Sequence, residues 1–212
     1  MKALPTVYIV NQDAVANSVT KRLLTSLNIF SQDFLTPSEL IHNAPFESHC
    51  CFLLSFLLPE MNGIELMLTL KRQGAYHPCI FTSPKMEAEF IVKAMHSGCF
   101  GFIKKPFQAL EFAELIQKAL ETDRKMTTYA RIAMEFEHNL QKLSPREKQV
   151  LELLLDDMSA MKIGNQLAIS HRTVENHRKK IFSKLDISKT PELVRKAAIY
   201  DTVQNTNILG IR

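Results

Sequence analysis

Residues 143–185 read LSPREKQVLELLLDDMSAMKIGNQLAISHRTVENHRKKIFSKL. The start of this stretch has the signals of a helix N-terminus. Ser144 and Glu147 have the spacing of a capping box, and Pro145 stands at the first helical position, where its missing N–H is not needed. Apolar residues then repeat every three or four positions, so we expect a first helix that begins at Pro145.

Two more helices are predicted in the same stretch. Ser159 begins a short second helix to about Leu167, and Ser170 caps a third helix that ends near Leu185. Only Ala168-Ile169 lie between these two helices, which leaves room for no more than a tight turn. The pattern therefore predicts a helix-turn-helix.

Positive charge is concentrated on the third helix. Segment 170–185 holds five cations and one anion. Residues 143–212 hold twelve Lys and Arg against eight Asp and Glu, whereas residues 1–142 hold fourteen of each, so the net charge of +4 lies in the C-terminal part. Many basic helices are only solvated faces, but cations beside three capped helices and a tight turn favour DNA binding.

Side chains on the third helix indicate how bases would be read. Val174 and Ile181 are expected to face inward and to leave the polar residues between them in solvent. Asn176 can pair with adenine, Lys179 can bind guanine, and Glu175 can accept from the amino group of cytosine.

From Leu143 to Ala198 the chain resembles the LuxR-type helix-turn-helix of FixJ/NarL-class response regulators, through LSPRE, IS-x-RTVE-x-H and KL. Asp157 departs from the family, which commonly has glycine there. A helix from Thr190 resembles the element by which such domains often pair, although it could simply close the small core.

The resemblance implies separate roles for the DNA-binding residues. We expect phosphate contacts from Ser159 and Lys162, base contacts from Glu175, Asn176 and Lys179, anchoring by Thr173, Arg178 and Lys180, and positive charge from Arg172.

The N-terminal part alternates apolar runs with helical patterns. The runs are Val7–Val10, Cys50–Leu54, Cys79–Thr82 and Phe100–Ile103. Strands that alternate with helices imply a parallel sheet covered on both faces, in one α/β domain of about 120 residues. Any site is expected at the carboxyl ends of these strands.

This part resembles a response-regulator receiver domain from about Val7 to Leu120. Pro59 with Gly63, Thr82 and the Lys105-Pro106-Phe107 turn carry the resemblance. It implies a doubly wound five-stranded parallel sheet of order 2-1-3-4-5. With the C-terminal helices, the expected fold is an α/β receiver plus an all-α helix-turn-helix domain, joined by a long helix.

The resemblance fails at the receiver's reactive pocket. Receivers carry two carboxylates after the first strand to hold Mg²⁺, and an aspartate four residues before the proline to accept a phosphoryl group. This chain has Asn11, Gln12 and Ser55 there, Asp13 is expected to cap a helix, and serine cannot form an acyl phosphate. We therefore expect a pseudo-receiver without phosphotransfer. Its pocket residues, joined by hydrogen bonds, would be Asn11, Gln12, Ser55, Thr82 and Lys105.

A long helical segment joins the two parts, with no Gly or Pro between Gln108 and Ser144. Its apolar residues step by three and four alternately, which favours left-handed pairing of two helices, each about 30 residues long. Such a homodimer would suit a two-fold DNA site. Alternatively, a fifth receiver helix ends near Asp123, and a loose linker lays the later apolar residues on the DNA-binding domain. The predicted dimer seam comprises Phe112, Leu115, Ala119, Met126, Tyr129, Ala133 and Phe136.

The expected domains are the pseudo-receiver at 1–120, the helical linker at 121–142 and the DNA-binding domain at 143–212. No apolar stretch is long enough to span a bilayer and no secretion signal is present, so we expect a soluble, cytoplasmic protein.

No nucleophile–base pair or phosphate-binding glycine loop indicates an enzyme. The cysteines lack metal-ligand spacing and are expected to be buried, so neither metal nor cofactor is expected. They are Cys50, Cys51, Cys79 and Cys99.

The sequence thus predicts a dimeric, sequence-specific transcription regulator that is controlled without phosphorylation. Control would come from abundance, from a protein partner or ligand on the receiver, or from dimerisation. Two alternatives stay open: phosphorylation at an unusual residue, and an interaction protein whose receiver sequesters a kinase or another regulator.

Overall fold

The computed structural model describes residues 4–43, 49–85 and 87–205. The chain divides into two compact units at Thr127–Thr128, and each is described here by itself. Residues 1–3 and 206–212, the outer ends of the expected domains 1–120 and 143–212, lie outside the described residues.

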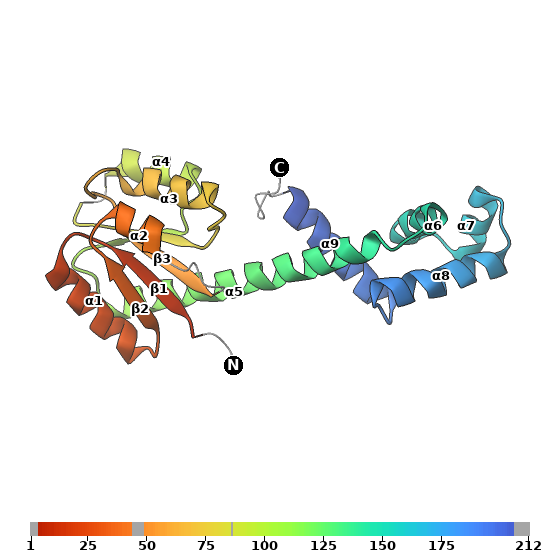
Figure 1. Cartoon of the computed structure of the whole chain (residues 1–212), viewed down its shortest axis with the longest axis horizontal. Coiled ribbons are helices and arrows are strands. Elements are labelled where there is room, and N and C mark those ends of the chain that lie inside the picture. Colours follow the sequence, from red (N-terminus) through yellow and green to blue (C-terminus); the bar gives the residue numbers. More distant parts are fainter. Residues whose placement is uncertain (1–3, 44–48, 86, 206–212) are drawn as a thin grey trace. The chain divides into compact units, whose positions relative to one another are not determined.

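One parallel sheet forms the centre of the N-terminal unit (Figure 1). In the described part of the chain it has five strands in the order β2-β1-β3-β4-β5, which confirms the predicted topology. The strands β1, β3 and β4 are buried along their whole length, as their apolar sequences require. The bounds are β1 Thr6–Val10, β2 Phe30–Phe34, β3 Cys50–Ser55, β4 Cys79–Ser83 and β5 Gly101–Lys104.

Helices cover both faces of this sheet, so the predicted doubly wound fold is confirmed. The side chains of α2, α3 and α4 pack in one apolar cluster with Tyr8, Phe52 and Phe81 of the sheet. The side chains of α1 and α5 pack in a second cluster, on the other face, with Val7 and Ile80. The bounds are α1 Ala14–Ser26, α2 Pro37–Asn43, α3 Gly63–Arg72, α4 Ala88–His96 and α5 Ala109–Leu140.

The pair β2 and α2 had no clear signal in the sequence. Phe34 is the buried residue of β2, whereas Phe30 is exposed and the residues between them are half-buried. The reason is composition: Ser31, Gln32 and Asp33 are polar, so β2 has no apolar run, although the other edge strand, β5, has one. An edge strand does not require the continuous apolar run by which the central strands were identified.

Helix α5 is continuous over 32 residues, as predicted for the joining segment. Asp123, three residues into the expected linker at 121–142, is only 2% exposed and belongs to the receiver's packing. Its Oδ1 lies 2.6 Å from Nδ1 of His77, and its Oδ2 accepts a 3.1 Å hydrogen bond from the backbone N–H of Cys50. These contacts attach α5 to the amino ends of β3 and β4.

Both ends of the predicted dimer seam are buried inside single units. Phe112 and Ala119 are buried in the receiver core, and Leu115 is half-buried against it. Ala133 is 1% exposed, and Phe136 is buried in the core of the C-terminal unit. The coiled coil stays a prediction, and the surface left for it is the middle of α5, where Met126 is half-buried and Tyr129 is 45% exposed.

The C-terminal unit is helical and has its own core. Each short helix contributes one or two fully buried residues to that core: Val150, Ile163, Val174, Ile181 and Leu193. The predicted inward face of the third helix is therefore confirmed. The helices are α6 Pro145–Leu155, α7 Ala160–Leu167, α8 His171–Leu185 and α9 Thr190–Asn205.

Candidate functional site

The helix starts in the C-terminal unit are those predicted from the caps. Ser144 Oγ accepts from the N–H of Glu147, and the N–H of Ser144 donates to Glu147 Oε2 at 2.8 Å, which completes the capping box. Ser159 and Ser170 cap α7 and α8 through their side-chain oxygens. Local hydrogen bonds thus determine where each of the three helices begins.

The turn between α7 and α8 depends on a close backbone approach. Ala168 ends α7 in the left-handed conformation, and the N–H of Ile169 donates to Gly164 O at 2.9 Å. A Cβ on Gly164 would lie 2.8 Å from Ile169 O, so a larger residue there would push the turn away. Gly164 therefore allows the tight turn through which α7 leads into α8.

An ion pair between the buried Glu147 and the partly exposed Lys184 ties the start of α6 to the end of α8. Lys184 Nζ donates to Glu147 Oε2 at 2.7 Å, and Glu147 is 4% exposed. The hydrogen bond from Lys184 lowers the pKa of Glu147 to about 2, helped by hydrogen bonds from Ser144 and opposed by burial. Lys184 was counted among the cations of the third helix, but the structure gives it this internal partner.

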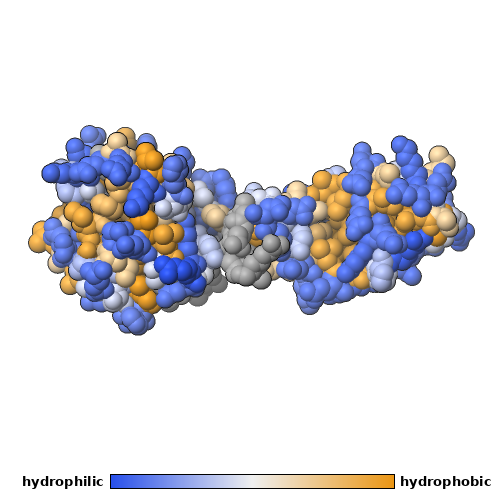
Figure 2. All heavy atoms as spheres, turned by 90° about the horizontal axis from the view of Figure 1, so that it is seen from above, coloured by the Kyte–Doolittle hydropathy of each residue, from blue (hydrophilic) through white to orange (hydrophobic). Residues whose placement is uncertain are grey.

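Most of the predicted DNA-binding residues are exposed. Val174, Ile181 and Leu185 hold one face of α8 against the core, so the opposite face meets solvent. Figure 2 shows hydrophilic side chains that extend from the end of the C-terminal unit where α7 lies. The exposed residues of the predicted set are Ser159, Lys162, Arg172, Asn176, Lys179 and Lys180, and the half-buried ones are Thr173, Glu175 and Arg178.

Arg178 and Glu175 have partners within the protein. Arg178 donates to Thr190 Oγ1 at 3.0 Å and lies over the ring of Phe182, 5.4 Å from its centroid. Glu175 Oε1 lies 3.7 Å from Arg178. Arg178 thus links α8 to the start of α9, and Nδ1 of the neighbouring His177 is buried without a partner among the described residues.

A second group of predicted residues meets at the carboxyl edge of the sheet. Ser55 ends β3 and is paired in register with Thr82 of β4. Asn11 follows β1, whose last residue pairs with the residue before Ser55. Lys105 follows β5, where burial lowers its pKa and the negative charge of Asp13 partly offsets that effect.

The hydrogen bonds at this edge differ from the predicted network. Ser55 Oγ donates to Leu57 O at 3.1 Å, within its own loop, and not to Thr82 or Lys105. Asn11 Nδ2 donates to Asn17 Oδ1 at 3.0 Å, and Asn17 Nδ2 donates back to Asn11 O at 2.9 Å. Ser55 bonds to a carbonyl only two residues away, within its own loop. The prediction considered only residues at the ends of strands, so it did not include Asn17, which lies in α1.

Two further residues shape this edge. Asp13 Oδ1 accepts from the N–H groups of Val15 and Ala16 at 3.0 Å each, so its predicted role as the cap of α1 is confirmed. Gln12 is exposed beside it. A Cβ on Gly63 would lie 2.9 Å from Ser55 O, so glycine allows α3 to begin directly against the end of β3.

No helix in the described part of the chain has both the length and the apolar character that crossing a bilayer requires.

Comparisons with known proteins match both units. Residues 7–120 match the response regulator receiver domain, and residues 141–197 match the luxR family of bacterial regulatory proteins. The response regulator protein TodT of Pseudomonas putida is 30% identical over 189 residues, covering 89% of this chain and 83% of TodT. The transcriptional regulatory protein FixJ of Bradyrhizobium diazoefficiens is 27% identical over 191 residues, covering 90% of this chain and 93% of FixJ.

Solved structures agree with these matches. The response regulator StyR superposes with a TM-score of 0.75 at 28% identity, covering 93% of this chain and all (100%) of the StyR chain. Full-length FixJ from B. japonicum superposes with a TM-score of 0.57 at 26% identity, covering 93% of this chain and 98% of the FixJ chain. The chain therefore belongs to the response regulators that join a receiver domain to a LuxR-type DNA-binding domain, and it is a transcriptional regulator.

Proposed function

We propose that this response regulator reads a specific DNA site through α8 and that phosphorylation of its receiver does not control it. The observation that carries the second part is Ser55, which ends β3 where the receiver resemblance implies an acceptor aspartate. The domains at 1–120 and 143–212 would then act through the linker at 121–142 without a phosphoryl signal.

The side chains at the carboxyl edge do not fit the Mg²⁺ ion that receivers hold there. Mg²⁺ prefers anionic oxygen ligands in octahedral geometry. Asn11 and Gln12 offer neutral amide oxygens in place of carboxylates, and Asp13 Oδ1 already accepts two backbone N–H groups of α1. We therefore assign no step in regulation to a bound metal.

Ser55 is also a poor acceptor by itself. A serine hydroxyl needs a base to remove its proton before it attacks phosphorus. Its Oγ donates to the carbonyl oxygen of Leu57, which cannot act as that base. Thr82, on the neighbouring strand β4, and Lys105, which follows β5, make no hydrogen bond with it among the described residues.

For DNA recognition we assign α8 to the major groove. Asn176 and Lys179 are exposed on the outer face of α8 and can pair with adenine and guanine. Ser159 and Lys162 at the start of α7 would contact phosphates, and Arg172 and Lys180 would add charge beside them. Thr173 stays assigned to anchoring, as does Arg178, whose bond to Thr190 supports that role. Glu175 is half-buried beside Arg178, so its base contact would require it to leave that pair.

We also propose that the protein acts as a homodimer on DNA. Two recognition helices about one helical turn apart would read a two-fold related site. Val194 on α9 is 48% exposed and Tyr129 on α5 is 45% exposed, so apolar surface is available in the C-terminal unit and in the middle of α5. The measurement is the molar mass in solution, with and without DNA, by light scattering.

Intact mass after incubation with acetyl phosphate and Mg²⁺ tests the receiver. We expect no phosphoryl adduct on the native chain. The matched variant carries Asn11→Asp, Gln12→Asp and Ser55→Asp, and a gain of one phosphoryl group by this variant shows that the assay can detect the reaction. An adduct on the native chain would overturn the proposal and favour phosphorylation at an unusual residue.

Selection of bound sequences from a random DNA pool tests the output. We expect one preferred site, and we expect Lys179→Ala and Asn176→Ala to lose the preference while Lys148→Ala, which removes an exposed cation of α6, keeps it. Unchanged selectivity in both α8 variants would exclude this interface. Unchanged gene regulation by variants that no longer bind DNA would instead favour sequestration of a partner.

A further inference from the structure

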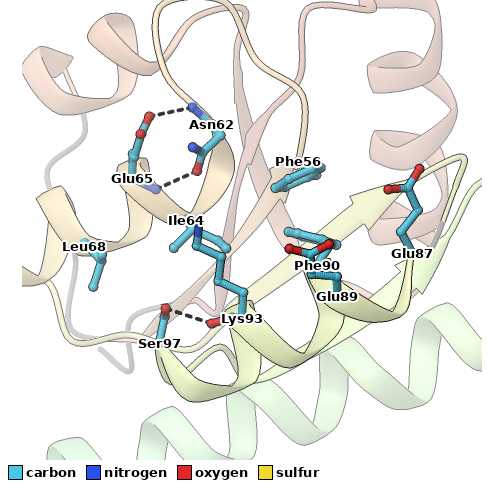
Figure 3. A pocket seen from close by; sticks show the side chains of 10 residues that line it. All are labelled: Phe56, Asn62, Ile64, Glu65, Leu68, Glu87, Glu89, Phe90, Lys93 and Ser97. Carbon is cyan, nitrogen blue, oxygen red and sulfur yellow. Dashed lines mark hydrogen bonds between the residues drawn. The ribbon is translucent and has the colours of Figure 1, made fainter.

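Two adjoining cavities open on the N-terminal unit beside α4. One, of about 420 Å³, lies between α3 and α4 (Figure 3). The other, of about 400 Å³, extends it toward the loop that follows β4. Phe56, Glu87 and Phe90 line both cavities, so the two form one continuous hollow, which we call the α3–α4 trough.

The floor of the trough is apolar and belongs to a packed core. Ile64 and Phe90 are 6% and 9% exposed, and the ring of Phe90 contacts that of Phe56. Phe90 also packs edge-on against Phe81 and Phe102, with ring centroids 6.0 Å and 5.8 Å apart. A floor that is held by the core exists before any ligand arrives, so binding does not have to order it.

The rim of the trough is acidic. Glu87 is the N-terminal flanking residue of α4 but its side chain makes no capping bond, and Glu89 lies in the first turn. Neither carboxylate has an ion-pair or hydrogen-bond partner among the described residues, whereas Glu65 across the trough is bonded to the N–H of Asn62. Lys93 lines the first cavity and Lys85 the second, so the carboxylates of Glu65, Glu87 and Glu89 exceed the positive charges of the lining by one.

We propose that the α3–α4 trough binds a small organic cation: an amine on an apolar, ring-bearing body. The cavities have the volume of small-molecule sites, about 300–1,000 Å³. The body would rest on Phe56, Phe90 and Ile64, the ammonium would meet Glu87 and Glu89, and the phenylalanine rings would add a cation–π contribution. An organic anion would be disfavoured, because the carboxylates of the lining outnumber its lysines by three to two.

The position of the trough gives such a ligand a regulatory consequence, and this part rests on the proposed function. The second cavity is lined by Leu57, whose carbonyl oxygen accepts the hydrogen bond from Ser55 Oγ, and by Ser83 at the end of β4. These are the ends of the two strands whose residues Ser55 and Thr82 are paired in register. A ligand in the trough would therefore act on the loops at which a phosphoryl signal enters an ordinary receiver.

Methyl NMR of the full chain tests the binding itself, without DNA or phosphodonor. The probes are phenethylamine, phenylpropionate and benzyl alcohol, added to millimolar concentration. We expect saturable shifts at the methyl groups of Ile64 and Leu68, with phenethylamine about threefold tighter than phenylpropionate because the partly screened carboxylates of the lining exceed its lysines by one.

Three variants make the test specific. Glu87→Gln with Glu89→Gln should abolish the preference for phenethylamine, because Glu65 then faces two lysines, Lys85 and Lys93, in the lining. Glu111→Gln is the matched control, since it removes an exposed carboxylate of α5 that lines neither cavity. Leu68→Trp, at a residue already 39% exposed, should fill the trough and weaken all three probes without loss of the folded spectrum.

Two results would overturn the proposal: no shifts at the trough with any probe, or equal affinity for the amine and the acid in the native chain. Shifts at the Ile64 methyl groups that persist unchanged in the Leu68→Trp protein would show that the probes do not occupy the trough and would also overturn it. The phosphorylation and DNA-selection experiments are independent of these probes, so failure here is distinguishable from failure of the proposed function.

Discussion

The ion pair between the buried Glu147 and the partly exposed Lys184 leads to a prediction about how the DNA-binding domain is held together. Glu147→Gln keeps the size of the side chain and an oxygen that can accept from the N–H of Ser144, 2.8 Å away in the native protein. It removes the charge that meets Lys184 at 2.7 Å. Because hydrogen bonds to charged groups contribute about 1.5–3 kcal/mol, we expect a loss of about 2 kcal/mol in the unfolding free energy of this domain.

The same variant should change the response to acid. The pKa of Glu147 is held at about 2, below its ordinary value of 4.5, so the folded state prefers the charged carboxylate. That contribution is fully present above about pH 4.5 and is lost as the pH falls toward 2, where the carboxyl group takes up a proton in both states. The stability difference between the native protein and Glu147→Gln should therefore shrink over this range.

Hydrogen exchange read by mass spectrometry on peptides from α6 and α8 measures this effect within the full chain. A loss of about 2 kcal/mol corresponds to about 30-fold faster exchange in these helices at neutral pH. Glu152→Gln, which removes an exposed carboxylate from the same helix, is the control and should exchange as the native protein does. Equal protection in Glu147→Gln and the native protein, or a difference that does not vary between pH 5 and pH 3, would refute the reasoning about this pair.

Three further predictions follow from other contacts. Lys179→Ala should reduce affinity for the preferred DNA site by about 1–3 kcal/mol and leave non-specific binding weakened only slightly, as gel-shift titrations against matched and scrambled sites would show. Gly63→Ala places a Cβ 2.8 Å from the ring of Phe81, so the receiver should lose about 1–3 kcal/mol in urea unfolding, and an unchanged midpoint would contradict this contact. Asp123→Asn weakens the buried pair with His77 and should expose to solvent the part of α5 that packs on the receiver. Hydrogen exchange at residues 115–123 would detect this. Undisturbed protection there would show that the pair does not hold the helix.

Local signals in the sequence were sufficient for much of the fold. The starts of α6, α7 and α8 were predicted because a cap involves residues three positions apart, and Ser144, Ser159 and Ser170 make those bonds. The central strands were predicted from apolar runs that both faces of a covered sheet require. Strand β2 was missed because its middle residues, Ser31, Gln32 and Asp33, are polar and leave no such run.

The sequence by itself determined the helix caps, the alternation of strands and helices, and the residue types at the sheet's carboxyl edge. Only the tertiary structure decided which side chains are free to act. Lys184 pairs with Glu147, 37 residues away, and Asp123 bonds to Cys50, 73 residues away. Caps and periodicity arise between neighbours along the chain, whereas the partner of a charge, and its access to water, is set only when distant segments pack together.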